Sequence, residues 1–481
     1  MDRLALLLVV LVAGALRLAF LDRAPLFIRP DSVPYFQAGY ELAYGLGPDL
    51  QLHRAAGYPL FLAGTIRLLG EDLRSIAIAQ HVLGVLTAAL AYLLGREVFG
   101  RLAGLGAGLL VALSAPLLIH EHSLMAETYF TFLLLLAFLL LARGLRRGPV
   151  GAHRRASLHV LGAGLVLGLA FQTRPVGLVV LPALWVGLLV QPGGWRRRLG
   201  QIGLLSVGFL GLAGPLFALN QTRAGEAGPA LGTFLYDRVA RHDTPPALPR
   251  ASSPAPTTDP RQVAARRALI KLVERKASRK IVDRDLRQKL GLSEAEANRA
   301  MREVALEVIW YQPEWYLRRT LENVGGILLG EVEPLQFHAT SRDRRDVRDA
   351  WLAQPRIAHL LEPTTDDQRR ELPAAEALAR VFQPAQHRVL LGVAIALGLA
   401  WCLARSAYRL SLALALAALA LVVAGAALVG DVPRYRYPAD PLLAVLAGGG
   451  VGTTLALGGA RLGRLWRGRA ALALPRAMRY T

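Results

Sequence analysis

The sequence is nearly without cysteine, since Cys402 is the single one among 481 residues. One cysteine excludes an intrachain disulfide and a cluster of thiolate metal ligands, and it leaves the redox compartment open. Lysine is almost as rare, so the basic side chains are nearly all arginines. Acidic residues are also in deficit, with 35 Asp and Glu against 56 Lys and Arg, which gives a net charge of +21.

The N-terminus lacks a cleavage signal. Met1-Asp2-Arg3 precedes an apolar run from Leu4 to Leu21, but no small-residue site of the A-x-A type follows it. We therefore expect a retained first helix in place of a removed signal peptide.

Hydrophobic residues make up 53% of the chain, and the mean hydropathy is +0.36. This is more apolar than the core of a soluble enzyme requires. The positive charge alone would fit a nucleic-acid-binding protein, but the arginines lie between apolar stretches and not on one soluble domain. The composition therefore predicts a membrane protein without a nucleic-acid partner.

About ten apolar segments reach the length that crosses a bilayer, about 20 residues, which predicts an all-α polytopic membrane protein. They cover residues 4–21, 75–95, 102–119, 123–142, 157–173, 175–191, 200–220, 387–404, 409–429 and 438–458. The count depends on whether the break at Arg174-Pro175 separates two spans. No internal repeat is visible, so nothing indicates the inverted halves of many transporters.

Arginine-rich short loops predict the topology, because positively charged loops stay cytoplasmic. Residues 143–155 contain five arginines and no acid, residues 196–198 are three arginines, and the tail after residue 460 contains six. With alternating spans, all three fall on the side of the N-terminus. We expect both termini in the cytoplasm of a bacterial inner membrane. The loops expected to face outward are 22–74, 120–122, 172–175, 221–386 and 430–437.

Two short helices are expected in the first outward loop. The segment 57–69 is apolar but too short to span and contains Arg67, and residues 33–44 form a second helix that Ser32 can cap. The predicted domains are a transmembrane module (1–220), an outward helical appendage with a Pro-rich segment at 245–260 (221–386), C-terminal transmembrane helices (387–460) and a basic cytoplasmic tail (461–481).

Candidate catalytic carboxylates lie in two outward loops. Asp31 follows the first span, where it can take a proton from an acceptor hydroxyl; alternatively, Asp31 or Ser32 only caps the following helix. Glu127 opens the fourth span, where an ionisable group is costly and usually functional, unless it is solvated among lipid headgroups. A divalent cation held by His120, Glu121, His122 and Glu127 is a further alternative, although His120 and His122 would point apart on a helix.

Arginines in outward loops are unexpected, because the charge bias depletes them there. They are Arg54, Arg174, Arg434 and Arg436. Guanidinium groups bind phosphate with two parallel hydrogen bonds and stay charged in a dry site, so the set suits a polyprenyl-phosphate leaving group. The alternative is that each arginine only reaches toward anionic lipid headgroups.

These motifs resemble the GT-C superfamily of membrane glycosyltransferases, in particular the bacterial protein O-mannosyltransferases and aminoarabinose transferases (glycosyltransferase family 39). The resemblance rests on Asp31, on Gly57-Tyr58-Pro59 after Arg54, on Glu127, on Arg174-Pro175 and on the late Arg434-Tyr435-Arg436 turn, in that order. It departs from the family where Ser32 replaces the second acid of an Asp-Glu pair and where Glu127 replaces the commoner Asp.

The resemblance implies a polyprenyl-phosphate sugar donor, a catalytic Asp31, and phosphate binding by Arg54 and Arg174. We expect transfer to a hydroxyl of a protein, lipid or cell-wall glycan with inversion at the sugar. Glu127 would orient the acceptor. Residues expected to line the site are Tyr35, His53, Tyr58, His122 and Tyr435. The alternatives are a lipid-linked sugar flippase or transporter, disfavoured because the ionisable residues cluster at one surface, and a ligase of a preassembled lipid-linked glycan.

Overall fold

The computed structural model of the chain describes residues 2–21, 26–29, 31–46, 55–145, 153–224, 231–243, 245–249, 260–275, 282, 284–329, 341–361, 388–404, 409–430 and 433–472. Within these ranges, the elements are helices joined by turns, and Phe27 and Ser123 form one isolated β-bridge. The predicted all-α polytopic fold is therefore confirmed.

Six helices of the described chain are long and apolar enough to cross a membrane. They are α1 (Asp2–Leu21), α4 (Leu73–Phe99), α7 (Glu127–Leu145), α8 (His153–Thr173), α19 (Arg409–Leu428) and α20 (Asp440–Leu472). The pair α5 (Arg101–Ala112) and α6 (Ala115–Glu121) makes a seventh if it counts as one span. Long runs of leucine, alanine and valine give these helices their apolar surface.

The remaining predicted spans are also helical, and two of them are short apolar helices. The short apolar elements are η1 (Pro175–Val179) with α9 (Val180–Leu189), and α18 (Arg388–Ala404), whereas α10 (Trp195–Ala224) covers the predicted 200–220. The predicted span 102–119 is a broken helix, because α5 and α6 meet at a bend of 54°. Pro116 stands in the first turn of α6, where it begins a new helix and cannot continue the old one.

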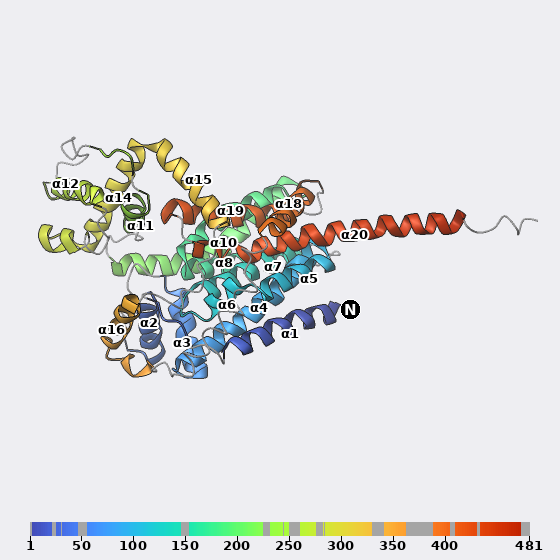
Figure 1. Ribbon diagram of the computed structural model, residues 1–481, viewed down its shortest axis with the longest axis horizontal. Coiled ribbons are helices and arrows are strands. Elements are labelled where there is room, and N and C mark those ends of the chain that lie inside the picture. Colours follow the sequence, from blue (N-terminus) through green and yellow to red (C-terminus); the bar gives the residue numbers. More distant parts are fainter. Residues whose placement is uncertain are drawn as a thin grey trace, which may run out of the picture.

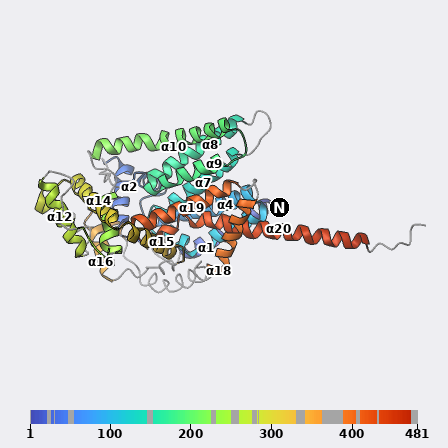
Figure 2. The ribbon, with the colours of Figure 1, turned by 90° about the horizontal axis from the view of Figure 1, so that it is seen from above.

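The long helices run side by side along the long axis of the molecule (Figure 1). The N-terminus and the extension of α20 lie at one end of this bundle, and α2 (Ser32–Tyr44), α3 (Gly57–Leu69), α11 (Leu231–Asp237) and α16 (Ser341–Leu352) gather at the other. The view turned by 90° shows the same extension of α20 and places α8, α9 and α10 along one side (Figure 2). The helices of the first loop and of the segment 221–386, both predicted to face outward, therefore gather at one end of the bundle.

The juxtamembrane helices form as predicted, but one cap is different. Helix α3 covers 57–69, and α2 begins at Ser32 with Asp31 at the N-cap position, where no side chain makes a capping hydrogen bond. The predicted cap by Ser32 is therefore wrong. The Ser32 hydroxyl instead donates to the carbonyl oxygen of Leu124 (2.8 Å).

The segment predicted as one appendage has two described parts. One has its own hydrophobic core and contains α11, η2 (Arg238–His242), α12 (Pro260–Glu274), η3 (Asp285–Lys289) and α14 (Glu294–Tyr311). The other is α16 with η5 (Ala358–Leu360), and its Trp351 lies fully buried against Phe36 of α2, with ring centroids 5.1 Å apart. Helix α15 (Pro313–Leu329) leads from the first part back to α19.

Helices α8 and α10 approach each other closely through glycines, as in many membrane bundles. A Cβ atom on Gly208 would lie 2.4 Å from the carbonyl oxygen of Leu161, and one on Gly164 would lie 2.2 Å from that of Leu205. Backbone atoms cannot move aside as side chains do. The contact therefore requires glycine on both helices.

We expect Gly208→Ala to destabilise the protein by about 1–3 kcal/mol, because the added methyl group forces α8 and α10 apart. Thermal unfolding of the detergent-purified protein measures the effect. Gly203→Ala on the same helix is the matched control, since a Cβ atom there meets nothing within 4 Å. Equal melting temperatures for the two variants would contradict this packing.

Candidate functional site

The segment between α6 and α7 holds the first loop by backbone hydrogen bonds. The Phe27 N–H donates to the carbonyl oxygen of His122 (2.9 Å), and the Leu124 N–H donates to that of Phe27 (3.0 Å). The fully buried Ser32 hydroxyl adds its bond to Leu124. Residues 122–124 therefore position the loop that carries Asp31.

Asp31 lies within a tight turn from Arg29 to Ser32. The Ser32 N–H donates to the carbonyl oxygen of Arg29 (2.9 Å), and the Arg29 N–H donates to the Ser32 hydroxyl oxygen (2.8 Å). The Asp31 side chain is partly buried, and it makes no capping hydrogen bond to α2. The alternative that Asp31 serves as a helix cap is therefore not supported.

Glu127 and Arg174 form an ion pair at this end of the bundle. An Nη1 to Oε1 distance of 2.5 Å joins them, and their side chains are 3% exposed for Glu127 and 16% for Arg174. The Arg174 guanidinium also lies over the ring of Tyr435, 5.7 Å from its centre. The alternative of a solvated Glu127 is wrong, because packing of α7 against its neighbours buries the carboxylate.

Arg174 reaches this position because α8 ends directly before it. Its backbone is extended (φ −145°, ψ 121°), as the steric demand of Pro175 favours for the preceding residue. The N-terminus of α3 packs against the same break, where a Cβ atom on Gly57 would lie 2.6 Å from the Thr173 hydroxyl oxygen. The Gly-Tyr-Pro element and Arg174 are thus brought together.

Tyr58 and Tyr35 join the site from the first loop. Their rings meet edge to face at 5.2 Å, and the buried Tyr58 hydroxyl donates to the Gln80 side-chain oxygen (2.8 Å). Burial raises the pKa of Tyr58 well above its usual range, and the negative charge of Glu127 acts in the same direction. Tyr58 therefore stays a neutral hydrogen-bond donor.

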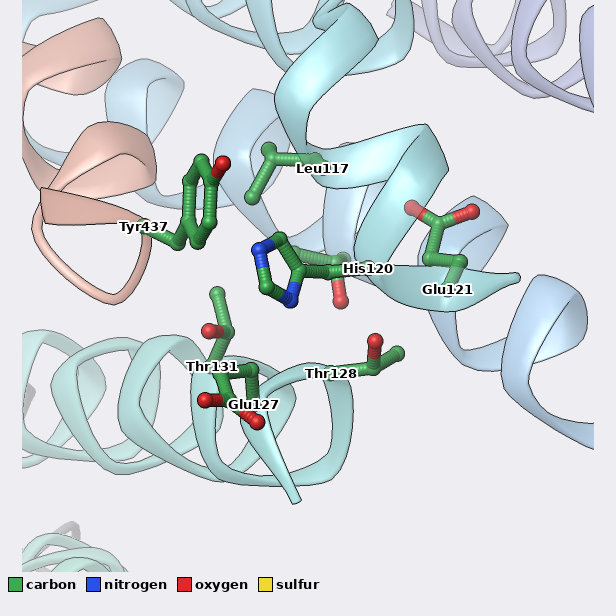
Figure 3. Close-up of a pocket in the computed structure, with 8 residues that line it drawn as sticks. Leu117, His120, Glu121, Glu127, Thr128, Thr131 and Tyr437 are labelled. Carbon is green, nitrogen blue, oxygen red and sulfur yellow. The ribbon is translucent and has the colours of Figure 1, made fainter. Parts of the chain in front are cut away.

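A small pocket lies beside the ion pair, and most of the residues that line it are of polar types (Figure 3). The His120 ring contacts the Tyr437 ring, with centroids 3.7 Å apart, while Glu121 points away from His120. The lining residues are Thr87, Leu117, His120, Glu121, Glu127, Thr128, Thr131 and Tyr437. Its volume of about 10 Å³ is close to the room that one water molecule needs.

The structure places the other predicted site residues differently. His122 is 1% exposed and contacts the His81 ring, so it does not line this pocket, although its neighbour His120 does. Arg436 is 5% exposed and donates to Asp440 (2.9 Å) and to the carbonyl oxygen of Leu328 (3.1 Å). His53 and Arg54 and the side chain of Arg434 lie outside the described residues.

The segment 231–329 contacts the loop that carries Tyr435. Arg238, which is fully buried and paired with Asp243, donates to the carbonyl oxygen of Ala426 (3.1 Å), and the Tyr316 hydroxyl donates to that of Ala427 (2.8 Å). These bonds hold the end of α19, directly before the turn η8 (Pro433–Arg436). The predicted appendage is therefore attached to the site end of the bundle.

Sequence reasoning missed Arg17, Gln80 and His81. Arg17 is 2% exposed in α1, where an arginine within an apolar span was itself a signal of function or pairing. It forms an ion pair with Glu121 (2.6 Å). Among the residues that the structure describes, no group of three or more His, Cys, Asp and Glu side chains is arranged to hold a metal ion.

Comparison with known proteins supplies a family for part of the chain. Residues 53–217 match the family of dolichyl-phosphate-mannose-protein mannosyltransferases. The matched segment contains Tyr58, Glu127 and Arg174, and it begins after Asp31 and ends before Tyr435. No curated protein sequence is significantly similar to the chain.

Two kinds of solved structure are similar at low identity. The archaeal oligosaccharyltransferase AglB from Archaeoglobus fulgidus, in complex with an inhibitory peptide and a dolichol-phosphate, has a TM-score of 0.47 and 14% identity, covering 99% of this chain and 52% of its own. ArnT from Cupriavidus metallidurans bound to undecaprenyl phosphate has a TM-score of 0.42 and 16% identity, covering 92% and 77%. The chain spans about half the length (52%) of the archaeal protein. For residues 53–217, the family match confirms the resemblance to the GT-C membrane glycosyltransferases that the motifs indicate.

Proposed function

We propose that the protein transfers a sugar from a polyprenyl-phosphate donor to an acceptor hydroxyl at the outer face of a membrane, with inversion at the anomeric carbon. One observation carries the proposal: residues predicted from separate loops meet at one end of the bundle. Glu127 pairs with Arg174, Arg174 lies over Tyr435, and Gly57 packs beside Thr173. The family match covers three of these loops.

Asp31 serves as the general base in this proposal. The acceptor hydroxyl gives its proton to the Asp31 carboxylate while its oxygen forms a bond to the anomeric carbon. The bond between that carbon and the phosphate oxygen breaks, and polyprenyl phosphate leaves with the electron pair. A single displacement of this kind inverts the configuration at the sugar. Asp31 is suited to the task because its turn is fixed by the bonds between Arg29 and Ser32.

Arg174 stabilises the negative charge that develops on the leaving phosphate, which is usually the largest catalytic contribution. A guanidinium has five N–H donors in a planar fork that matches phosphate oxygens, and one bond to Glu127 does not use all five. Glu127 then orients Arg174, in addition to the acceptor role that the sequence suggested. Arg54, Arg434 and Arg436 complete the proposed positive surface, with Arg436 held by Asp440.

The topology proposed from the arginine-rich loops suits this chemistry. With the N-terminus and the α20 extension on the cytoplasmic side of a bacterial inner membrane, the site end of the bundle faces outward. Cell-surface acceptors lie on that side. A protein, a lipid or a cell-wall glycan hydroxyl all fit the proposed reaction.

Asp31→Asn is expected to lower the transfer rate by about 100-fold to 10,000-fold, because the amide cannot accept the proton. Transfer of radiolabelled sugar from a polyprenyl-phosphate donor to an envelope extract measures it. Asp72→Asn is the matched control: Asp72 caps α4 through the Ser75 N–H, and asparagine caps equally well.

Substantial residual turnover in Asp31→Asn would exclude Asp31 as the base. Should the wild-type protein transfer no label while the donor crosses proteoliposome membranes, the flippase alternative would replace the proposed function. Transfer only from a lipid diphosphate carrying an assembled glycan would support the ligase alternative.

The double variant Glu127→Gln/Arg174→Gln is expected to weaken binding of undecaprenyl phosphate by about ten-fold to 100-fold, since it removes a charge-assisted bond to phosphate. Changing both residues leaves neither charge buried alone. Arg67→Gln, an exposed arginine of α3, is the control for general charge effects. Equal affinities for the double variant and the wild-type protein, measured by quenching or calorimetry in detergent, would exclude Arg174 from donor binding.

A further inference from the structure

A chain of four buried polar side chains lies behind the candidate site. Arg17 Nη2 donates to Glu121 Oε1 (2.6 Å), Glu121 Oε2 contacts His81 Nδ1 (3.2 Å), and His81 Nε2 contacts His122 Nδ1 (2.8 Å). All four side chains are at most 5% exposed. They come from α1, α4 and the end of α6, so the chain of bonds joins three helices.

The bonding pattern orients both rings. Glu121, which bonds Arg17 through one carboxylate oxygen, faces His81 Nδ1 with the other. An imidazole that donates from Nδ1 can accept at Nε2, where His81 contacts Nδ1 of His122. Each ring thus has one orientation, set by the carboxylate through its neighbour. The side chain of His122 is further enclosed by edge contacts to the rings of Phe20 and Phe27, each 5.1 Å away.

The residues around Glu121 leave space for its carboxylate and bond the neighbouring backbone. On α4, Gly84 leaves space for it, since a Cβ atom there would lie 2.1 Å from the carboxyl carbon of Glu121. Gln80, one turn earlier, donates to the carbonyl oxygens of Glu121 and Ser123 (both 2.9 Å). Arg17 also donates to the carbonyl oxygen of Ala112 (2.9 Å), at the end of α5. The bend between α5 and α6 and the strand-like residues after α6 are therefore fixed by the same group of side chains.

We propose that Glu121 is a positioning residue of the transfer reaction, which acts through residues 122–124 on Asp31. This inference rests on the proposed function. Glu121 and His81 fix the position of His122. The carbonyl oxygen of His122 accepts a hydrogen bond from the Phe27 N–H. The carbonyl oxygen of Leu124 accepts one from the hydroxyl of Ser32, the neighbour of Asp31. The same segment leads directly into Glu127. One carboxylate thus aligns the base loop with the start of the helix that carries the partner of Arg174.

The energetics favour positioning over simple stabilisation. A buried ion pair contributes little net stability, because desolvation of both charges offsets their attraction. Apolar side chains would hold α1 against α6 at lower cost. The Arg17–Glu121 pair instead fixes a single arrangement of the groups bonded to it. This matters for catalysis, because a displacement of about 1 Å at a catalytic group lowers the rate by about 100-fold.

The test compares two variants with two controls in the full-length protein. The first variant, Glu121→Gln, removes the negative charge but leaves Arg17 without its charged partner. The second variant, Gly84→Ala, keeps every charge and displaces the Glu121 carboxylate. Glu97→Gln changes another buried carboxylate, paired with Arg96 at the far end of α4, and Gly14→Ala adds a methyl group to α1 where nothing lies within 4 Å. Hydrogen exchange, kcat, KM for the donor and the melting temperature are measured for all four.

Both variants are expected to lower kcat by about 100-fold while KM for the donor changes by less than about three-fold. Amide exchange is expected to rise at Phe27 and Leu124, whose N–H groups form the bonds between the first loop and residues 122–124. Neither control produces these changes. A role in stability alone would lower the melting temperature and raise exchange throughout the bundle, with kcat per folded molecule unchanged, and that result would overturn the proposal.

The exchange measurement does not depend on activity. A wild-type protein without transfer activity would refute the proposed function, whereas unchanged exchange at Phe27 and Leu124 in both variants would refute the positioning role. Increased exchange at these amides with normal kcat in an active protein would also refute it, because the loop would then be free to move without consequence for the reaction.

Discussion

A charge buried within a helical membrane bundle needs a partner, and this requirement organises the end of the molecule where the candidate site lies. Among the described residues, Arg17 pairs with Glu121, Arg174 with Glu127, and Arg436 with Asp440. The Arg17–Glu121 pair joins α1 to α6, which are distant in sequence. The Arg174–Glu127 pair joins the end of α8 to the start of α7. Each pair therefore fixes the relative position of two elements as well as the direction of a guanidinium group.

The same requirement applies to backbone groups freed by broken helices. Non-helical backbone at membrane depth is tolerated only where protein groups satisfy it. Here α5 ends at Ala112, whose carbonyl oxygen accepts from Arg17. Residues 122–124 lie between α6 and α7, where Gln80, Ser32 and Phe27 supply the partners. The side chains that satisfy these breaks come from α1, α4 and the first loop. Interrupting a span thus creates both the bend that brings His120 beside Tyr437 and the bonds that hold Asp31 in place.

Much of this architecture could be predicted from the sequence, because hydropathy and length determine which segments become apolar helices. The helix at 57–69 has its predicted ends, and Glu127 begins a span as expected. The partner of Glu127 could not be predicted, since it depends on how α7 and α8 pack. Arg17 stands within a run of leucine, valine and alanine, and the apolar character of the run conceals one arginine. The position of Ser32 predicts a helix cap, but its hydroxyl bonds the carbonyl oxygen of Leu124 in the packed structure. Local patterns predict elements, whereas the pairing of polar groups follows from the packed bundle.

The segment between α10 and α18 is more than an appendage, because it contacts both parts of the candidate site. On one side, Trp351 packs against Phe36 and Arg356 pairs with the buried Glu41 (2.8 Å), so α16 covers the helix that follows Asp31. On the other side, Arg238 and Tyr316 hold the end of α19. The turn with Tyr435 follows immediately, and Arg436 within it bonds back to Leu328 of α15. Both halves of the candidate site, the loop with Asp31 and the turn with Tyr435, are thus supported by this one segment.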